Sequence, residues 1–351
     1  MAADEPRIVD RLISLCRYSL DNSFKPSFQK IDQELILAGI SNKAESLISA
    51  AAGDGVIEFA EEARASLFHF EQFKKTKNAH AAASVLIAQS AMHAVRIDCV
   101  HFKGTVFQWL LYGNPFYRLS CDADILVNEA DFRLAAESLK AKGLKRRHQG
   151  SGFWWEHFLE ELHFDDEDGN RNVDLHKGIK QPGIPRYDDV NGILRRSEPV
   201  RFLGSELKVP CLTDTYAILL INFAKALINR QPALSYLMDI LALAKKNPQM
   251  CSDQAFAELP QSLRPTLKLS IHTANVLFGT LENVREWTTR QGIQIADKDL
   301  IAAVFPSLFT QADLPRRREL LRLLHAGHAA GYLHEMWNLA SSEILRRSSH
   351  S

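Results

Sequence analysis

The sequence RLSCDADILV, residues 118–127, decides how the middle of this chain folds. Its last residues form an uninterrupted apolar run that predicts a short buried strand. Because side chains alternate along a strand, Asp122 and Asp124 point to one side, while Ala123 and Ile125 point to the other. Two neighbouring carboxylates repel each other and raise each other's pKa, which a fold tolerates when a cation lies between them.

Hard oxygen ligands at this spacing suit Mg²⁺ or Mn²⁺, which bind one or two carboxylates and complete their coordination with water and substrate phosphates. A second interpretation needs no metal. An Asp-X-Asp sequence is common, and Asp122 would then be a turn or cap residue at the solvated start of a strand. The two readings differ in whether further ligands are brought to the same place.

Other short runs around this stretch predict strands, and two amphipathic segments predict helices between them. One helix begins at Gly104 and ends at Gly113, and the second occupies 128–143. The sequence HFDDEDGNRNVDLH predicts two antiparallel strands joined by an acidic turn, and EPVRFLGSELKVP predicts a second hairpin. The predicted strands of the sheet lie at 97–102, 122–127, 158–164 and 171–176.

The periodicity divides the chain into three parts. Residues 1–95 have a helical pattern, residues 96–212 alternate between strand and helix patterns, and residues 213–351 are again helical. We therefore expect an α+β fold in which a small mixed β-sheet core is flanked by N-terminal and C-terminal helical regions.

The composition is that of an ordinary globular protein of 351 residues, with 46% hydrophobic residues. Its 42 basic and 42 acidic residues cancel, so the bulk charge does not indicate nucleic acid or an anionic membrane as a partner, although local patches stay open. The segment PRRRELLRLLHAGH, residues 315–328, is such a patch: a basic amphipathic helix that is either a solvated face or a contact for RNA or an acidic partner.

The five cysteines are scattered and form no Cys-X-X-Cys pair, which favours reduced thiols. The first residues lack the basic and apolar regions of a signal peptide, and no run of 18 apolar residues occurs. We expect a cytoplasmic protein with no membrane partner.

Two further features favour a ligand site over a solvated strand end. The sequence FKGTVF places Gly104 at a strand-to-helix junction, where free backbone N–H groups can hold a phosphate. The sequence NVDLH supplies Asp174 on a later strand, with His176 on the same face. A third carboxylate would complete a site for two metal ions.

This combination resembles the nucleotidyltransferase superfamily of the DNA polymerase beta type. More narrowly, FKGTVFQWLLY, YRLSCDADILV, DFRLAAESLKAKGL and VDLHKGI are similar to a bacterial family of uncharacterised nucleotidyltransferases. The resemblance covers about residues 97–180 and implies a nucleotidyltransferase core.

The resemblance also implies roles for particular residues. Asp122, Asp124 and Asp174 would bind two Mg²⁺ or Mn²⁺ ions and be the catalytic residues. The NTP, with ATP as the first candidate, would be held by a second group of residues, of which Lys103 and Arg118 would neutralise phosphate. That nucleotide-binding group is Lys103, Gly104, Thr105, Arg118 and His176. Lys103 and Arg118 can equally form surface salt bridges, and His176 can be a locally hydrogen-bonded histidine.

The function that this resemblance implies is transfer of an NMP from an NTP to an unidentified acceptor, which can be a small molecule, a tRNA or a protein. Two other functions are compatible with the same residues. One is a nucleotide-binding or interaction module that retains the fold without turnover. The other is a metal-dependent phosphohydrolase that uses water as acceptor, for which the sequence lacks a His-Asp metal motif.

Overall fold

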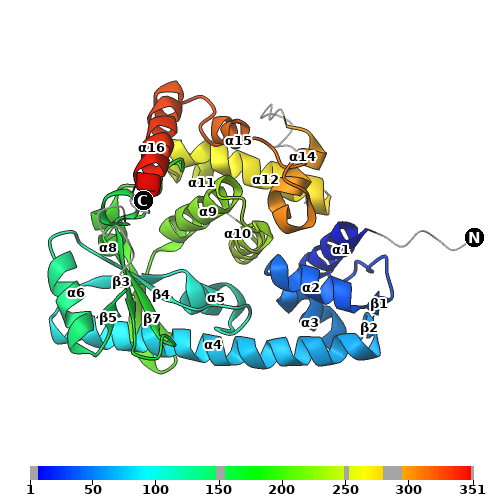
Figure 1. Cartoon of the computed structure of the whole chain (residues 1–351), viewed down its shortest axis with the longest axis horizontal. Coiled ribbons are helices and arrows are strands. Elements are labelled where there is room, and N and C mark those ends of the chain that lie inside the picture. The colour runs from blue at the N-terminus through cyan, green and yellow to red at the C-terminus, as the bar shows by residue number, and fades with distance from the viewer. Residues whose placement is uncertain (1–6, 148–154, 249–252, 280–294, 349–351) are drawn as a thin grey trace, which may run out of the picture.

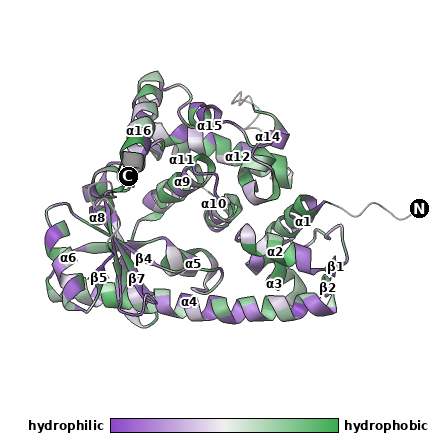
Figure 2. Cartoon of the chain, in the orientation of Figure 1, coloured by the Kyte–Doolittle hydropathy of each residue, from purple (hydrophilic) through white to green (hydrophobic). Residues whose placement is uncertain are grey.

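A computed structural model describes residues 7–147, 155–248, 253–279 and 295–348. Its longest element is α4 (Glu61–Ala94), whose 34 residues extend about 51 Å. This helix runs beneath both the sheet and the N-terminal helices, so it connects the two parts (Figure 1). Figure 2 shows hydrophilic and hydrophobic bands alternating along α4, as expected for a helix with one buried face.

The N-terminal region is helical, as the sequence predicts, with one addition. Between its helices lie two strands of two residues each, which pair in parallel. Strands this short have no readable periodicity, so the sequence does not reveal them. The elements are α1 (Ile8–Leu20), β1 (Lys30–Ile31), α2 (Gln33–Ser41), α3 (Glu45–Gly53) and β2 (Glu58–Phe59).

The central sheet has five strands in the order β3-β4-β7-β6-β5. Strands β4 and β7 pair in parallel, and the other three pairs are antiparallel, so the predicted mixed sheet is confirmed. The two predicted helices connect these strands as α5 (Gly104–Tyr112) and α6 (Phe132–Ala141). The strands are β3 (Cys99–Phe102), β4 (Ala123–Val127), β5 (Lys145–Arg146), β6 (Glu161–Asp165) and β7 (Asn172–His176).

The strand predicted at 158–164 begins only at Glu161. Residues Trp155–Leu159 form a π-helical turn, and Glu160 has a positive φ of 56° that breaks an extended strand. The predicted second hairpin is confirmed as β8 (Glu198–Phe202) and β9 (Ser205–Val209). It is preceded by the short helix α8 (Val190–Arg196).

The two faces of the sheet pack against different parts of the protein. Ala123, Ile125 and Val127 of β4 join a hydrophobic cluster with α4, α6 and the second hairpin. Leu126, together with Phe102 of β3, joins the larger cluster formed with the N-terminal and C-terminal helices. Asp124 therefore lies on the face that is turned toward the C-terminal helices, opposite Ala123 and Ile125, as the alternation predicts.

The C-terminal region consists of helices that cover this second face (Figure 1). Buried residues of α9 and α1 belong to one cluster, so the two helical regions share a core. No helix of the described residues is long and apolar enough to cross a membrane. The helices are α9 (Leu212–Ile228), α10 (Leu234–Lys246), α11 (Asp253–Glu258), α12 (Arg264–Phe278), α14 (Asp297–Val304), α15 (Arg317–Leu324) and α16 (Ala329–Ser348).

His101 of β3 links the stability of this sheet to pH. Its side chain is fully buried, with Nε2 2.9 Å from Oε1 of Gln89, and its Nδ1 has no hydrogen-bond partner among the described residues. Burial lowers the pKa of His101 to about 4, from an ordinary 6.5. The unfolded chain therefore takes up a proton at this residue between these two pH values, while the folded chain does not.

We expect the His101 contribution, roughly 3 kcal/mol, to be present above pH 6.5 and to be lost as the pH falls toward 4. The variant His101→Gln cannot titrate here. Urea unfolding of both proteins across this range should show that the native protein loses more stability than the variant. Parallel curves for the two proteins would contradict the assignment.

Candidate active site

The turn between β3 and α5 requires glycine at one position. Lys103 and Gly104 both have positive φ, at 63° and 50°. A Cβ on Gly104 would lie 3.1 Å from the carbonyl oxygen of Asp122 and 3.1 Å from Oγ of Ser120. The first turn of α5 is thus in close contact with the backbone of Asp122. The N–H groups of that turn have no partner within the helix, as at any helix N-terminus.

The segment 118–120 before the aspartates is anchored to other helices. Asn78 of α4 is fully buried, donates to the carbonyl of Arg118 at 2.8 Å and accepts from the amide of Ser120 at 2.7 Å. Oε1 of Glu45 accepts from the amide of Leu119 at 3.1 Å. These bonds fix the backbone from which Asp122 and Asp124 project. Asn78 has this positioning role without any motif in the sequence that would indicate it.

Asp124 and Asp174 lie side by side on neighbouring strands. The parallel pairing of β4 with β7 places these two residues directly opposite each other in register. Oδ1 of Asp124 is 3.0 Å from Nζ of Lys103 and 3.0 Å from Nε2 of His176. Asp124 is almost fully buried, whereas Asp174 is partly exposed. Two of the predicted carboxylates are thereby brought together with two of the predicted nucleotide-binding residues.

Two side chains that are not among the predicted site residues complete this cluster. Nδ1 of His163 is 2.5 Å from Oδ1 of Asp174, and Nε2 of the same ring is 3.3 Å from Oε1 of Glu161. Oε2 of Glu161 is 3.3 Å from Nδ1 of His176. Acids and histidines therefore alternate along one connected row, which runs Asp174, His163, Glu161, His176, Asp124.

A signal for these two residues exists in the sequence ELHFD of β6. Leu162 and Phe164 belong to the hydrophobic cluster below the sheet, so Glu161 and His163 must point to the opposite face, toward Asp124. The alternation alone predicts this polar face. The identity of its partners depends on β6 lying next to β7, which the sequence does not specify.

The charges of the cluster shift the pKa values of its members in opposite directions. Burial and the neighbouring charges of Asp124 and Asp174 raise the pKa of Asp122 to about 7. Burial opposes ionisation of Asp124, but Lys103 and His176 hold its pKa well below the ordinary value. Asp122 precedes β4 and is not part of the group of ligand atoms within 4.8 Å of one another, so of the three predicted carboxylates the structure brings Asp124 and Asp174 into that group, with His176 as its third member.

His163 of β6 forms ion pairs with Glu161 and Asp174. Burial opposes protonation of His163, but its hydrogen bonds to Asp174 and Glu161 raise its pKa to about 10. Burial also opposes ionisation of Glu161, yet the hydrogen bond from His163 and the neighbouring His176 lower its pKa to about 2. At neutral pH this is a cationic His163 between two carboxylates.

The donor set is compatible with a divalent cation. One ligand atom each from Asp124, Asp174 and His176 lie within 4.8 Å of one another. Among the described residues, the hydrogen bonds of both aspartates are made at Oδ1, and Oδ2 of each would be a further ligand atom for a cation. In addition, Oγ1 of Thr105 is buried and has no hydrogen-bond partner among those residues. A bound phosphate or hydrated cation would satisfy this orphaned hydroxyl.

Arg118, predicted to contact phosphate, has structural partners. Its guanidinium forms an ion pair with Asp239 of α10 and donates to the carbonyl of Ser235 at 3.3 Å. Asp239 also accepts from the hydroxyl of Tyr112 at 2.8 Å. The arginine therefore ties the loop after α5 to the C-terminal helices. Both terminal nitrogens of its guanidinium donate to Asp239, one to each carboxylate oxygen, so the arginine has a structural role here, and its predicted contact with phosphate stays a prediction.

Comparison with known proteins gives a family. A family model described as uncharacterised nucleotidyltransferase matches residues 39–279. Among solved structures, the chain is similar to an antigenic nucleotidyltransferase-like protein from Paracoccidioides brasiliensis, with a TM-score of 0.37 and 15% sequence identity over 60% of this chain and 93% of that chain. No curated protein matches the chain. Because the family model spans more than half of the sequence, this chain belongs to the uncharacterised nucleotidyltransferase family.

Proposed function

We propose that this protein transfers an NMP from an NTP to an acceptor and releases pyrophosphate, with Asp122, Asp124 and Asp174 holding two divalent metal ions. The observation that carries the proposal is the register of β4 with β7, which sets Asp124 beside Asp174 next to the Gly104 turn. The family to which the chain belongs supports the same reaction class.

Each predicted residue has a task in this reaction. The backbone N–H groups of the first turn of α5, with the Thr105 hydroxyl, would bind phosphate oxygens. Lys103, whose pKa is raised by the nearby Asp124 against the cost of burial, would stay charged and face the same phosphates. Asp122 and Asp124 would hold both ions, and Asp174 one of them. Bound Mg²⁺ or Mn²⁺ would stabilise the attacking and leaving oxygens of the transfer.

Several finer points belong to the proposal. ATP with Mg²⁺ is the first pair to examine, and we place the protein in the cytoplasm. The acceptor is a small molecule, a tRNA or a protein. A nucleotide-binding module without turnover and a phosphohydrolase are the alternative functions, and a labelling experiment separates all three.

Turnover should depend on the buried carboxylate. We expect Asp124→Asn to reduce NMP transfer by at least about 10³-fold, because a loss of roughly 4 kcal/mol of transition-state stabilisation corresponds to that factor. The protein is incubated with each α-labelled NTP, Mg²⁺ or Mn²⁺, and cell extract as acceptor source. Asp98→Asn is the matched control, since Asp98 is a half-exposed carboxylate paired with Lys208 at the edge of β3.

The labelled products distinguish the functions. A labelled acceptor that disappears in Asp124→Asn but not in Asp98→Asn supports the transferase. Binding of NTP without any labelled product would indicate the nucleotide-binding module without turnover. Free monophosphate without a labelled acceptor would indicate hydrolysis. Equal labelling by native protein and Asp124→Asn would contradict the proposed site.

The close contact at Gly104 predicts a second effect. Gly104→Ala adds a Cβ at 3.1 Å from two oxygen atoms, whereas Gly113→Ala, at φ 70° on the other end of α5, meets no heavy atom within 4 Å. Both substitutions strain the backbone by about 1–2 kcal/mol. We expect only Gly104→Ala to weaken NTP binding, by about tenfold or more, in equilibrium titrations. Similar affinities for the two variants would show that the turn does not contact the nucleotide.

The row of acids and histidines predicts a third effect. Glu161→Gln removes the charge that orients both His163 and His176, so Asp174 and Asp124 lose their fixed positions. Loss of such outer partners costs about 10–100-fold in metal affinity or activity. We expect the Mg²⁺ concentration that gives half-maximal transfer to rise by a factor in this range, while the affinity for NTP changes little.

The control for this effect is Glu167→Gln, an exposed residue of the β6–β7 turn. A Glu161→Gln protein with the native metal dependence would show that Glu161 only stabilises the sheet.

A further inference from the structure

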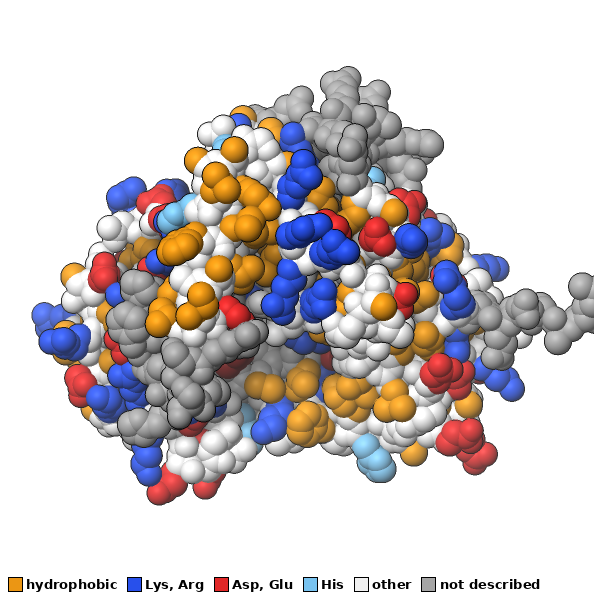
Figure 3. Space-filling model, turned by 45° about the horizontal axis from the view of Figure 1, so that its top comes forward, with side chains coloured by type: hydrophobic (Ala, Val, Ile, Leu, Met, Phe, Trp, Pro, Cys, Tyr) orange, Lys and Arg blue, Asp and Glu red, His pale blue; other side chains and the backbone are white. Residues whose placement is uncertain are grey.

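The basic segment 315–328 forms part of a second site, away from the carboxylate cluster. Its helix α15 buries Leu320, Leu321 and Leu324 against the C-terminal core. The opposite face carries exposed arginines, and Figure 3 shows Lys and Arg side chains gathered in the middle of the upper face of the molecule. The exposed arginines of this segment are Arg316, Arg317, Arg318 and Arg322.

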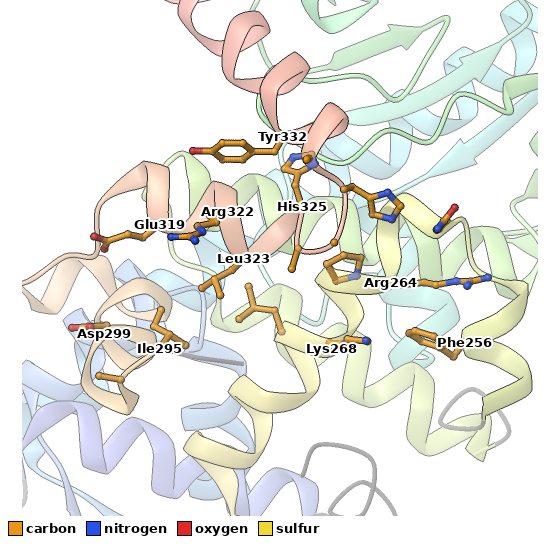
Figure 4. Close-up of a pocket in the computed structure, with 18 residues that line it drawn as sticks. Phe256, Arg264, Lys268, Ile295, Asp299, Glu319, Arg322, Leu323, His325 and Tyr332 are labelled. Atoms are coloured by element: carbon orange, nitrogen blue, oxygen red, sulfur yellow. The ribbon is translucent and has the colours of Figure 1, made fainter. Parts of the chain in front are cut away.

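A wide cleft of about 1480 Å³ lies next to these arginines. Its walls come from α11, α12, α14, α15 and α16, and Figure 4 shows Arg264 and Lys268 of α12 and Arg322 of α15 among the side chains around it. Arg264 and Lys268 are four residues apart on one helix, which separates them by about 6 Å along its axis. Arg322 belongs to another helix, so the cations of the cleft come from two of its walls.

In the part of the chain that the structure describes, the cations of α12 and of residues 316–322 are not paired with acids, in contrast to two other arginines. Arg118 and Arg196 are each bound by a buried aspartate. Among the described residues, no carboxylate forms an ion pair with Arg264, Lys268, Arg322 or the three arginines at 316–318. Of the two acids that line the cleft, Glu319 accepts from the backbone amide of Arg316 at 3.2 Å and so serves as a helix cap.

Rings in the cleft add a second kind of contact. Phe256 lies beneath both cations of α12, with Cζ of Arg264 5.2 Å and Nζ of Lys268 5.4 Å from its centroid. Tyr332 and His325 line the same space (Figure 4). Only 6% of the surface of His325 is exposed, and its Nε2 has no hydrogen-bond partner in the described part of the chain. Cations beside aromatic rings and an unsatisfied polar atom suit a ligand with both phosphates and bases.

We propose that this cleft binds a single-stranded segment of RNA, with the arginines and Lys268 on its phosphates and the rings beside its bases. A small anion does not explain the site, because pockets for small molecules measure about 300–1,000 Å³ and converge on few polar groups. Two of the three cations that line the cleft, Arg264 and Arg322, are arginines, whose planar fork matches phosphate. The balanced bulk charge is no obstacle, since affinity depends on the local cations.

The test is direct binding by the full-length protein, without NTP or metal, so its result does not depend on the proposed transfer reaction. Fluorescence anisotropy of a labelled single-stranded RNA of about 20 nucleotides measures Kd over about 50 to 200 mM salt. The variant is Lys268→Glu with Arg322→Glu. One matched control is Arg133→Glu, at an exposed arginine on α6 without an ion pair among the described residues. The other is Asp124→Asn, in the carboxylate cluster of the candidate active site.

We expect the double variant to raise Kd by about tenfold or more and to lower the slope of log Kd against log salt by about 1.4, since each lost phosphate contact contributes about 0.7 for single strands. Arg133→Glu and Asp124→Asn should bind as the native protein does, and unchanged thermal melting of the double variant would show that its fold is intact. No RNA binding at low salt, or equal binding by the double variant, would overturn the proposal. Tighter binding of polyglutamate than of RNA would also overturn it, in favour of an acidic protein partner.

Discussion

The parallel pairing of β4 with β7 is the constraint on which the candidate active site depends. It sets Asp124 opposite Asp174, and the antiparallel pairing of β6 with β7 then brings Glu161 and His163 to the same face. Side chains of a sheet alternate, so the apolar residues of these strands pack below while the acids and histidines gather above. A shift of one residue in the β4 register would turn Asp124 into the hydrophobic cluster.

Burying this many charges is costly unless each has a partner, and the row of acids and histidines supplies them. Lys103 is paired with Asp124 at one end of the row, and His163 is paired with Asp174 at the other. Asp122 lies outside this row, and burial together with its acidic neighbours raises its pKa. Negative charge that is not fully compensated therefore lies beside a helix N-terminus. This arrangement suits a ligand that combines a cation with a phosphate.

Helices outside the sheet hold the segments that carry the candidate active site. Through Asn78, α4 fixes the segment before Asp122, and the Arg118–Asp239 pair ties the loop after α5 to α10. On the other side of the C-terminal helices, the cations of α12 and α15 line a cleft of their own. The carboxylate cluster and the basic cleft differ in charge and in position, so each can be altered while the other is left intact.

The sequence by itself determined the local features: the strand predicted at 122–127, which forms at 123–127, the glycine turn at 104, the hairpin at 198–209 and the basic face of residues 316–322. Each follows from alternation, helical periodicity or turn chemistry over a few residues. Only the tertiary structure decided which partners these features have, such as His163 for Asp174, Asp239 for Arg118 and α12 for the arginines of α15. Those contacts join residues up to 121 positions apart, and the hydrophobic packing that closes such distances leaves no local pattern in the chain.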